Sequence, residues 1–72
     1  MDIKVQIGNR VRELRKQCKI TQEQLAIIAG LDRTYIASVE EGHRNISIVN
    51  INKISKALGV SLKEFFNYKD FE

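Results

Sequence analysis

Residues 21–42 read TQEQLAIIAGLDRTYIASVEEG and contain two short helical patterns in close succession. Thr21 and Gln24 form a capping box, in which each side chain can bond the backbone of the other, so a helix is predicted to begin here. Gly30 suits the left-handed position after a helix end because it has no Cβ to clash. Asp32 is a preferred N-cap residue, so a second helix is predicted to follow it directly.

The two predicted helices span about residues 22–29 and 33–41, so only residues 30–32 join them. A link this short forces the two axes to cross steeply, as they do in a helix-turn-helix. Close crossing needs a small side chain at the contact, and Ala26 stands where it would meet Ile36. A helix-turn-helix is therefore expected, with a plain helical bundle as the alternative.

The rest of the chain also carries helical signals, and it contains no proline. Apolar residues at helical spacing predict one helix over about residues 3–18 and two more after the N-cap residues Ser47 and Ser61. The inward face of the first helix is expected to carry Ile7, Val11, Leu14 and Cys18. These signals predict an all-α fold, a compact five-helix domain over residues 1–72 with residues 67–72 frayed.

The composition of the 72-residue chain excludes several classes of protein. This length predicts one small domain, and one Cys with one His cannot supply a structural zinc site or an internal disulfide. The longest apolar run, residues 25–29, is far shorter than the ~20 residues that cross a bilayer. The start Met-Asp-Ile-Lys lacks the hydrophobic stretch of a signal peptide. We therefore expect a soluble intracellular protein with a reduced thiol.

The net charge of +3 lies in the N-terminal half of the chain. Residues 1–36 carry seven Lys or Arg and four acids (7 − 4 = +3), whereas residues 37–72 carry five of each. This asymmetry indicates an anionic partner approached from one side, with ordinary solubilising charge as the alternative. An enzyme is not expected, because His43 has no Cys or Ser partner at a recognisable spacing and the carboxylates Glu40 and Glu41 have no pocket.

The exposed residues of the predicted second helix fit the edges of DNA bases. A helix in the major groove contacts bases mainly from its N-terminal residues, where Arg33 can bond guanine and Thr34 can offer a hydroxyl or a methyl group. The predicted base-contacting residues are Arg33, Thr34, Tyr35, Ser38 and Arg44. The predicted phosphate-contacting residues are Gln22, Asn45 and His43. Tyr35 could instead pack within the protein or against a second protomer, and His43 could be a plain loop residue.

A dimer is expected because one recognition helix reads only a few base pairs. Two copies related by a twofold axis double the readout and place the half-sites one helical turn, or a multiple, apart. The last predicted helix has roughly two turns and carries more large apolar groups than a small domain easily buries. The predicted dimer-interface residues are Leu62, Phe65, Phe66 and Val49, with simple capping of the core as the alternative.

Residues 7–66 resemble the Cro and phage-repressor (XRE-type) family of helix-turn-helix proteins. The matching positions are Ile7-Gly8, Arg12, Leu14-Arg15, Thr21-Gln22-Glu23-Gln24-Leu25-Ala26, Gly30-Leu31, Ile36, Val39-Glu40-Glu41-Gly42 and Leu58-Gly59-Val60-Ser61. Within this family, residues 31–36 and 42–47 resemble the controller proteins of restriction–modification systems. The resemblance implies that four residues meet DNA: Arg33, Thr34, Arg44 and Asn45. It also implies a partly buried structural ion pair between Arg15 and Glu40.

These observations predict a sequence-specific transcriptional regulator that binds double-stranded DNA as a homodimer on a roughly palindromic operator. The resemblance implies control of a restriction–modification system. Alternatives are a phage-type repressor, a DNA-binding antitoxin and, in a different class, a protein-interaction module. The expected partners are operator DNA, a second copy of the chain and RNA polymerase, with no membrane, cofactor, metal or small-molecule ligand. The expected location is the prokaryotic cytoplasm, at the nucleoid.

Overall fold

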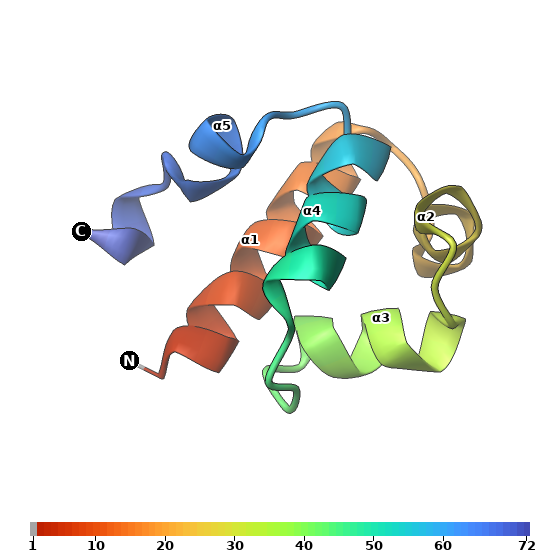
Figure 1. The fold of residues 1–72 in the computed structure, drawn as a ribbon, viewed down its shortest axis with the longest axis horizontal. Helices are drawn as coiled ribbons and strands as arrows, with labels where there is room; N and C mark the ends of the chain where they lie inside the picture. The colour runs from red at the N-terminus through yellow and green to blue at the C-terminus, as the bar shows by residue number, and fades with distance from the viewer. Residues whose placement is uncertain (1) are drawn as a thin grey trace.

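A computed structural model of the chain describes residues 2–72, which form five α-helices and a short 3-10 helix. The elements are α1 (Ile3–Gln17), α2 (Gln22–Ala29), α3 (Arg33–Glu40), α4 (Ile48–Ala57), α5 (Leu62–Phe66) and η1 (Lys69–Phe71). In Figure 1, α1 and α4 run through the middle of the molecule, with α2 and α5 at opposite sides and α3 below. Residues 2–72 contain no strand, so the predicted all-α fold with five helices is confirmed. None of these helices combines the length and the apolar character that spanning a membrane requires.

Polar N-cap side chains define where the α-helices begin. At the start of α2, the backbone N–H of Gln24 donates to Thr21 Oγ1 at 3.1 Å, and the backbone N–H of Thr21 donates to Gln24 Oε1 at 2.8 Å. Both bonds of the predicted capping box are therefore present, and a second box joins Ser61 and Glu64. The observed bounds of α1, α2 and α3 differ from the predicted bounds by no more than one residue, because capping signals mark helix starts strongly.

The hydrophobic core draws side chains from all five α-helices. Its fully or nearly fully buried members are Ile7, Val11, Leu14, Leu25, Ala26, Ile36, Val39, Ile51, Ile54, Leu58 and Phe65. Removal of these side chains from water is the main favourable contribution to folding. Cys18, which was predicted on the inward face, is exposed instead. That prediction was wrong because α1 ends at Gln17, so Cys18 lies at the C-cap, outside the core, with its Sγ 3.5 Å from the carbonyl oxygen of Leu58.

Gly8 lies where α1 passes closely over the end of α3. A Cβ at this position would come within 2.4 Å of the carbonyl oxygen of Val39 and 2.8 Å of that of Glu40. Both neighbours are backbone atoms that cannot rotate away, so only glycine lets the two helices pack at this distance. The sequence prediction placed the close helix contact at Ala26, which is buried in the core, and gave no such role to Gly8.

The segment 67–72, which was predicted to be frayed, is folded against the domain in the structure. The 3-10 helix η1 brings Phe71 into contact with the core cluster. Arg10 of α1 donates to the carbonyl oxygen of Phe65 at 2.8 Å, and its guanidinium lies 4.9 Å from the centre of the Tyr68 ring. The arginine thus bonds a free carbonyl at the end of α5 and packs against the segment that follows.

Candidate nucleic-acid interface

The turn between α2 and α3 is shaped by Gly30. Its φ of +71° lies in the left-handed region, which favours glycine. The backbone N–H of Leu31 donates to the carbonyl oxygen of Ala26 at 2.9 Å, which closes the end of α2. Figure 1 shows α2 nearly end-on and α3 lengthwise, so the two axes cross steeply. This arrangement is the predicted helix-turn-helix.

The first turn of α3 is exposed and is held by the N-cap residue Asp32. The Asp32 carboxylate accepts hydrogen bonds from the backbone N–H of Thr34, at 2.8 Å, and from its hydroxyl. The hydroxyl bond, followed by the backbone bond, lowers the pKa of Asp32 from its ordinary value. Because the hydroxyl proton is directed to Asp32, Thr34 presents an acceptor oxygen and a methyl group to a ligand.

Arg33 is exposed beside the start of α2. It lines an open, polar depression with a volume of ≈ 630 Å³. The other polar residues that line this depression are Arg15, Lys19, Thr21, Gln22 and Glu23. Lys19 and Arg33 place positive charge beside the start of α2, and a helix N-terminus with cationic neighbours suits the oxygens of a phosphate group. Arg15 of the same lining is bonded to Glu40, and Glu23 adds one negative charge.

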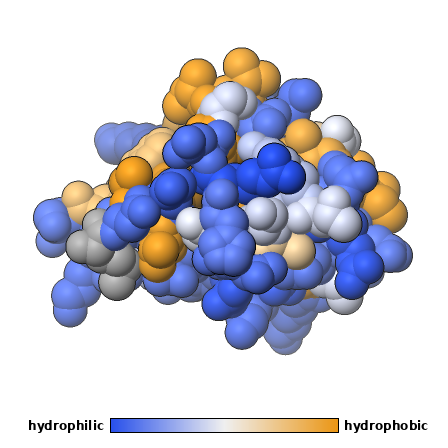
Figure 2. Space-filling view, turned by 90° about the horizontal axis from the view of Figure 1, so that it is seen from below, coloured by the Kyte–Doolittle hydropathy of each residue, from blue (hydrophilic) through white to orange (hydrophobic). Residues whose placement is uncertain are grey.

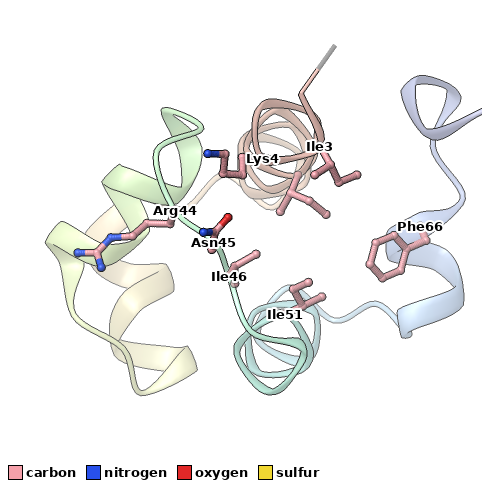
Figure 3. Close-up of a pocket in the computed structure, with 8 residues that line it drawn as sticks. Ile3, Lys4, Arg44, Asn45, Ile46, Ile51 and Phe66 are labelled. Carbon is pink, nitrogen blue, oxygen red and sulfur yellow. The ribbon is translucent and has the colours of Figure 1, made fainter.

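Arg44 follows α3 in the loop, and its guanidinium stands over the ring of Tyr35. The distance from Arg44 Cζ to the ring centre is 5.1 Å, which is a cation–π geometry. The Tyr35 hydroxyl accepts a hydrogen bond from the side-chain amide of Asn50 on α4 at 3.1 Å. Figure 3 shows Arg44 extending across α3, away from the side chains of Ile51 and the other apolar residues drawn there. Contacts within the protein therefore hold Arg44 on the side of α3.

Glu40, at the end of α3, is the centre of a buried polar cluster. Its carboxylate accepts hydrogen bonds from Arg15 Nε at 2.7 Å, Arg15 Nη2 at 3.0 Å and Gln22 Nε2 at 3.1 Å. Arg12 Nε lies 3.5 Å from the same carboxylate. Burial raises the pKa of Glu40, but the hydrogen bonds and positive charges of these partners outweigh that effect, so its pKa lies below the ordinary value. The cluster ties together α1, α2 and α3.

The remaining predicted DNA-contacting residues lie at three places. Gln22 is half-buried and lines the polar depression, while its amide bonds Glu40. Ser38 is half-buried in the second half of α3, and His43 and Asn45 are exposed in the loop that follows. Figure 2 views the molecule from below, the side on which α3 lies, and this face is mainly hydrophilic with hydrophobic groups toward its margins. The structure thus gives α3 a polar surrounding.

Three of the four residues predicted at a dimer interface are exposed. Val49 is 59% exposed, Phe66 39% and Leu62 37%. Phe65 is 0% exposed, so it leaves no surface for a second chain, contrary to the prediction. The reason is that neighbouring residues of a helix point in different directions, and of the two phenylalanines only Phe65 faces the core.

Two further exposed apolar residues, Ile3 and Ile48, lie on the same group of helices. A pocket of ≈ 300 Å³ lies between α1, α4, α5 and the loop after α3, as Figure 3 shows. Its lining combines apolar residues such as Ile3, Ile51 and Phe66 with the polar residues Lys4, Arg44 and Asn45. We use the name apolar face for the exposed residues Ile3, Ile48, Val49, Leu62 and Phe66. The signal that could have revealed Ile48 is that four of the residues 46–51 are apolar, which is more than one helix face can bury.

Sequence reasoning gave no role to Arg12 or to Asn50. Arg12 Nη2 donates to the backbone oxygen of Glu40 at 3.1 Å, so it also bonds a free carbonyl at the end of α3. The spacing of Arg12 and Arg15 places them on one face of α1, and this was the available signal. No sequence pattern predicted the bond between Asn50 and Tyr35, because it joins two different helices.

Comparison with known proteins agrees with this geometry. The Helix-turn-helix family model matches residues 11–65. The control protein C.MunI of a Mycoplasma species is 48% identical over 67 residues, which cover 92% of this chain and 90% of the relative. The crystal structure of the restriction–modification controller protein C.AhdI from Aeromonas hydrophila has a TM-score of 0.84 and 48% identity, over 88% of this chain and 96% of that one. The C.Esp1396I controller tetramer in complex with its natural 35 base-pair operator has a TM-score of 0.87 and 35% identity, over 92% and 87%.

The chain therefore belongs to the helix-turn-helix family. Within that family it is similar over most of its length to the controller proteins of restriction–modification systems. Its matched relatives are regulators rather than enzymes, so the family places no catalytic role on these residues.

Proposed function

We propose that the protein is a sequence-specific transcriptional regulator that binds double-stranded operator DNA and controls a restriction–modification system. The observation that carries the proposal is the exposed first turn of α3, with Arg33 beside the polar depression at the start of α2. A helix presented in this way enters the major groove with its N-terminal residues at the base edges. The similarity to controller proteins, one of which is described on its natural operator, supports the assignment.

In this proposal the polar residues divide between bases and backbone. Arg33 offers parallel donors to guanine O6 and N7, and Thr34 offers its methyl group to thymine or its hydroxyl oxygen to an amino group. Further base contacts are assigned to Tyr35, Ser38 and Arg44. Phosphate contacts are assigned to Gln22, His43 and Asn45, with Gln22 at the depression beside the N-terminus of α2.

We further propose that the protein binds as a homodimer through the apolar face. Exposed apolar groups of this size on α1, α4 and α5 mark an interaction surface, and a second copy would bury them. A twofold dimer presents two α3 helices to a roughly palindromic operator, which doubles the number of base pairs that are read. RNA polymerase is the further partner at the promoter, and the prokaryotic cytoplasm, at the nucleoid, is the location.

Selection of bound duplexes from a random pool tests the proposal. We expect an enriched sequence with two inverted half-sites about one helical turn, or a multiple, apart. The variant Arg33→Ala should enrich a sequence that is less defined at a base pair in each half-site, because it loses the bidentate contact. A wild-type protein that enriches no sequence would exclude sequence-specific regulation.

A further inference from the structure

On the α3 side of the molecule, one hydrogen bond and one cation–π contact link three side chains from three different segments in a series. The Asn50 amide of α4 donates to the Tyr35 hydroxyl of α3 at 3.1 Å. The Tyr35 ring in turn lies 5.1 Å from the guanidinium carbon of Arg44 in the loop. Exposure rises along the series, because Asn50 and Tyr35 are half-buried and Arg44 is exposed.

Asn50 is the fixed end of this series. Its backbone N–H donates to Ser47 Oγ at 3.1 Å, so the capping bond of α4 sets its position. Tyr35 is partly buried against the hydrophobic core, which restricts rotation of its ring, and the hydroxyl bond to Asn50 fixes the position of the outer end of the ring. Arg44 is different, because a long exposed side chain on a loop has many rotamers unless a neighbour restricts them.

We propose that Asn50 is a positioning residue for base recognition, which acts through Tyr35 to hold Arg44 where it reads DNA. The proposal rests on the proposed function, since it assigns a role within the same site. The ring of Tyr35 supplies a flat surface for the guanidinium, and the bond from Asn50 keeps that surface in place. The planar guanidinium is then oriented before DNA arrives, so less conformational freedom is lost when it bonds a base.

The direction of the bond has a second consequence. Asn50 is the donor, so the Tyr35 hydroxyl uses an oxygen lone pair and keeps its own proton. That proton is free for an acceptor on DNA, such as a phosphate oxygen or a base carbonyl. Asn50 thus fixes both the place of the ring and the hydrogen-bonding character that the hydroxyl shows to a ligand.

The test starts by identifying the base pairs that Arg44 reads. Dissociation constants are measured for the selected operator and for duplexes with single base-pair changes, with wild-type protein and with Arg44→Ala. The positions at which Arg44→Ala loses discrimination define the Arg44 set, and Arg33→Ala defines a separate set in the same way. We expect Asn50→Ala to reduce discrimination by about two- to tenfold at the Arg44 set, and to leave the Arg33 set unchanged.

A double-mutant cycle separates positioning from general stability. Tyr35→Phe removes the hydroxyl that bonds Asn50, so at the Arg44 set it should reproduce the effect of Asn50→Ala, and the double variant should lose no more at this set than Tyr35→Phe alone. If the circular dichroism spectrum shows that Asn50→Ala is unfolded, Tyr35→Phe replaces it in the test. Asn52→Ala is the matched control: it removes the same type of half-buried side chain from the same helix, and it should bind like wild type.

Two results with the Asn50 and Tyr35 variants would overturn the inference while leaving the proposed function intact. One is full discrimination at the Arg44 set in both Asn50→Ala and Tyr35→Phe. The other is an equal loss of affinity for every duplex, which would indicate that the bond only stabilises the fold. An Arg44→Ala protein that discriminates like wild type would also overturn it. Failure of the wild-type protein to select any operator would instead contradict the proposed function.

Discussion

Arg15 and Glu40 are joined by two parallel hydrogen bonds, at 2.7 and 3.0 Å, although 25 positions separate them in the sequence. Glu40 is only 2% exposed, and it lies at the contact between α1 and α3. A buried charge is unfavourable unless it is paired and hydrogen-bonded. Each of these two charged side chains therefore needs the other to compensate the free-energy cost of its burial.

Loss of one partner of this pair should destabilise the fold strongly. Glu40→Ala leaves the Arg15 guanidinium without its carboxylate, and removal of one partner from a buried pair typically costs about 3–5 kcal/mol. We expect a decrease of this order in the free energy of unfolding, measured by urea denaturation and circular dichroism. The neighbouring exposed residue supplies the control, because Glu41→Ala should change stability by less than about 0.5 kcal/mol. Equal effects of the two substitutions would contradict a structural role for the pair.

Stability should fall in acid because of the same carboxylate. The folded pKa of Glu40 lies below its ordinary value of 4.5. Such a group stabilises the fold above its unfolded pKa, and the contribution is lost as the pH falls through the folded pKa. The free energy of unfolding should therefore decrease as the pH drops below about 4.5, and Glu40→Gln should make this decrease shallower. Asp32 also has a lowered pKa, so Asp32→Asn should likewise make the fall in the free energy of unfolding with decreasing pH shallower, independently of Glu40. An unchanged acid profile in Glu40→Gln would count against the assignment.

The close passage of α1 over α3 predicts an unusual sign for Gly8→Ala. Within a helix, replacement of glycine by alanine ordinarily stabilises by roughly 0.5–1 kcal/mol. At Gly8 the new methyl group would meet two backbone carbonyls, so we expect a destabilisation of about 1–3 kcal/mol or more. Thermal unfolding of Gly8→Ala beside Asn9→Ala, at the next position of α1, measures the effect. A stabilised Gly8→Ala protein would show that the helices can separate without cost.

Salt dependence should distinguish base contacts from phosphate contacts in the proposed complex. Lys19 lines the polar depression beside Gln22, where the proposed complex places a phosphate, so Lys19→Ala should weaken binding to all duplexes alike. The slope of log affinity against log salt should become less steep by about 0.9 for one lost phosphate contact. Arg33→Ala should instead reduce discrimination at its base pair by about 1–3 kcal/mol. Fluorescence anisotropy over a range of salt concentrations gives both quantities, and a slope near zero in the wild type would exclude DNA binding through phosphates.

Charge placed on the apolar face should separate the proposed dimer. Phe66→Asp and Val49→Asp each bury a carboxylate in the interface, which is unfavourable without a partner. Sedimentation at micromolar concentration should show a dimer for wild type and a monomer for both variants. Ile27→Asp is the control, because Ile27 is 73% exposed but lies on α2, outside the apolar face. A wild-type monomer that also binds its operator as a monomer would contradict the proposal.

Local signals explain how much of the fold was predictable. Capping residues such as Thr21 and Ser61, and Gly30 at the turn, act on their immediate neighbours, so the helix starts and the helix-turn-helix were identified from the sequence. The close contact at Gly8 could not be identified in this way, because it depends on how two helices far apart in the sequence meet. The position of Phe71 against the core was missed for the same reason.

In the candidate site, too, features set by local sequence were predictable and features set by packing between helices were not. The exposure of Arg33 and Thr34 follows from their places just after an N-cap, which a sequence shows directly. The burial of Phe65 beside an exposed Phe66 does not, since two adjacent phenylalanines look equivalent until the orientation of α5 is known. The bond from Asn50 to Tyr35 is likewise a result of packing between helices.

The buried cluster around Glu40 also bears on how the molecule comes apart. One carboxylate of α3 accepts bonds from α1 and α2, so α1 and α3 cannot separate without stranding a charge, and α2 cannot detach without breaking the bond from Gln22. An excised fragment of α2 and α3 would lack Arg15, and it should be largely unstructured in isolation. Amide protons in all three helices should then exchange with solvent through the same global opening, and should do so at similar rates.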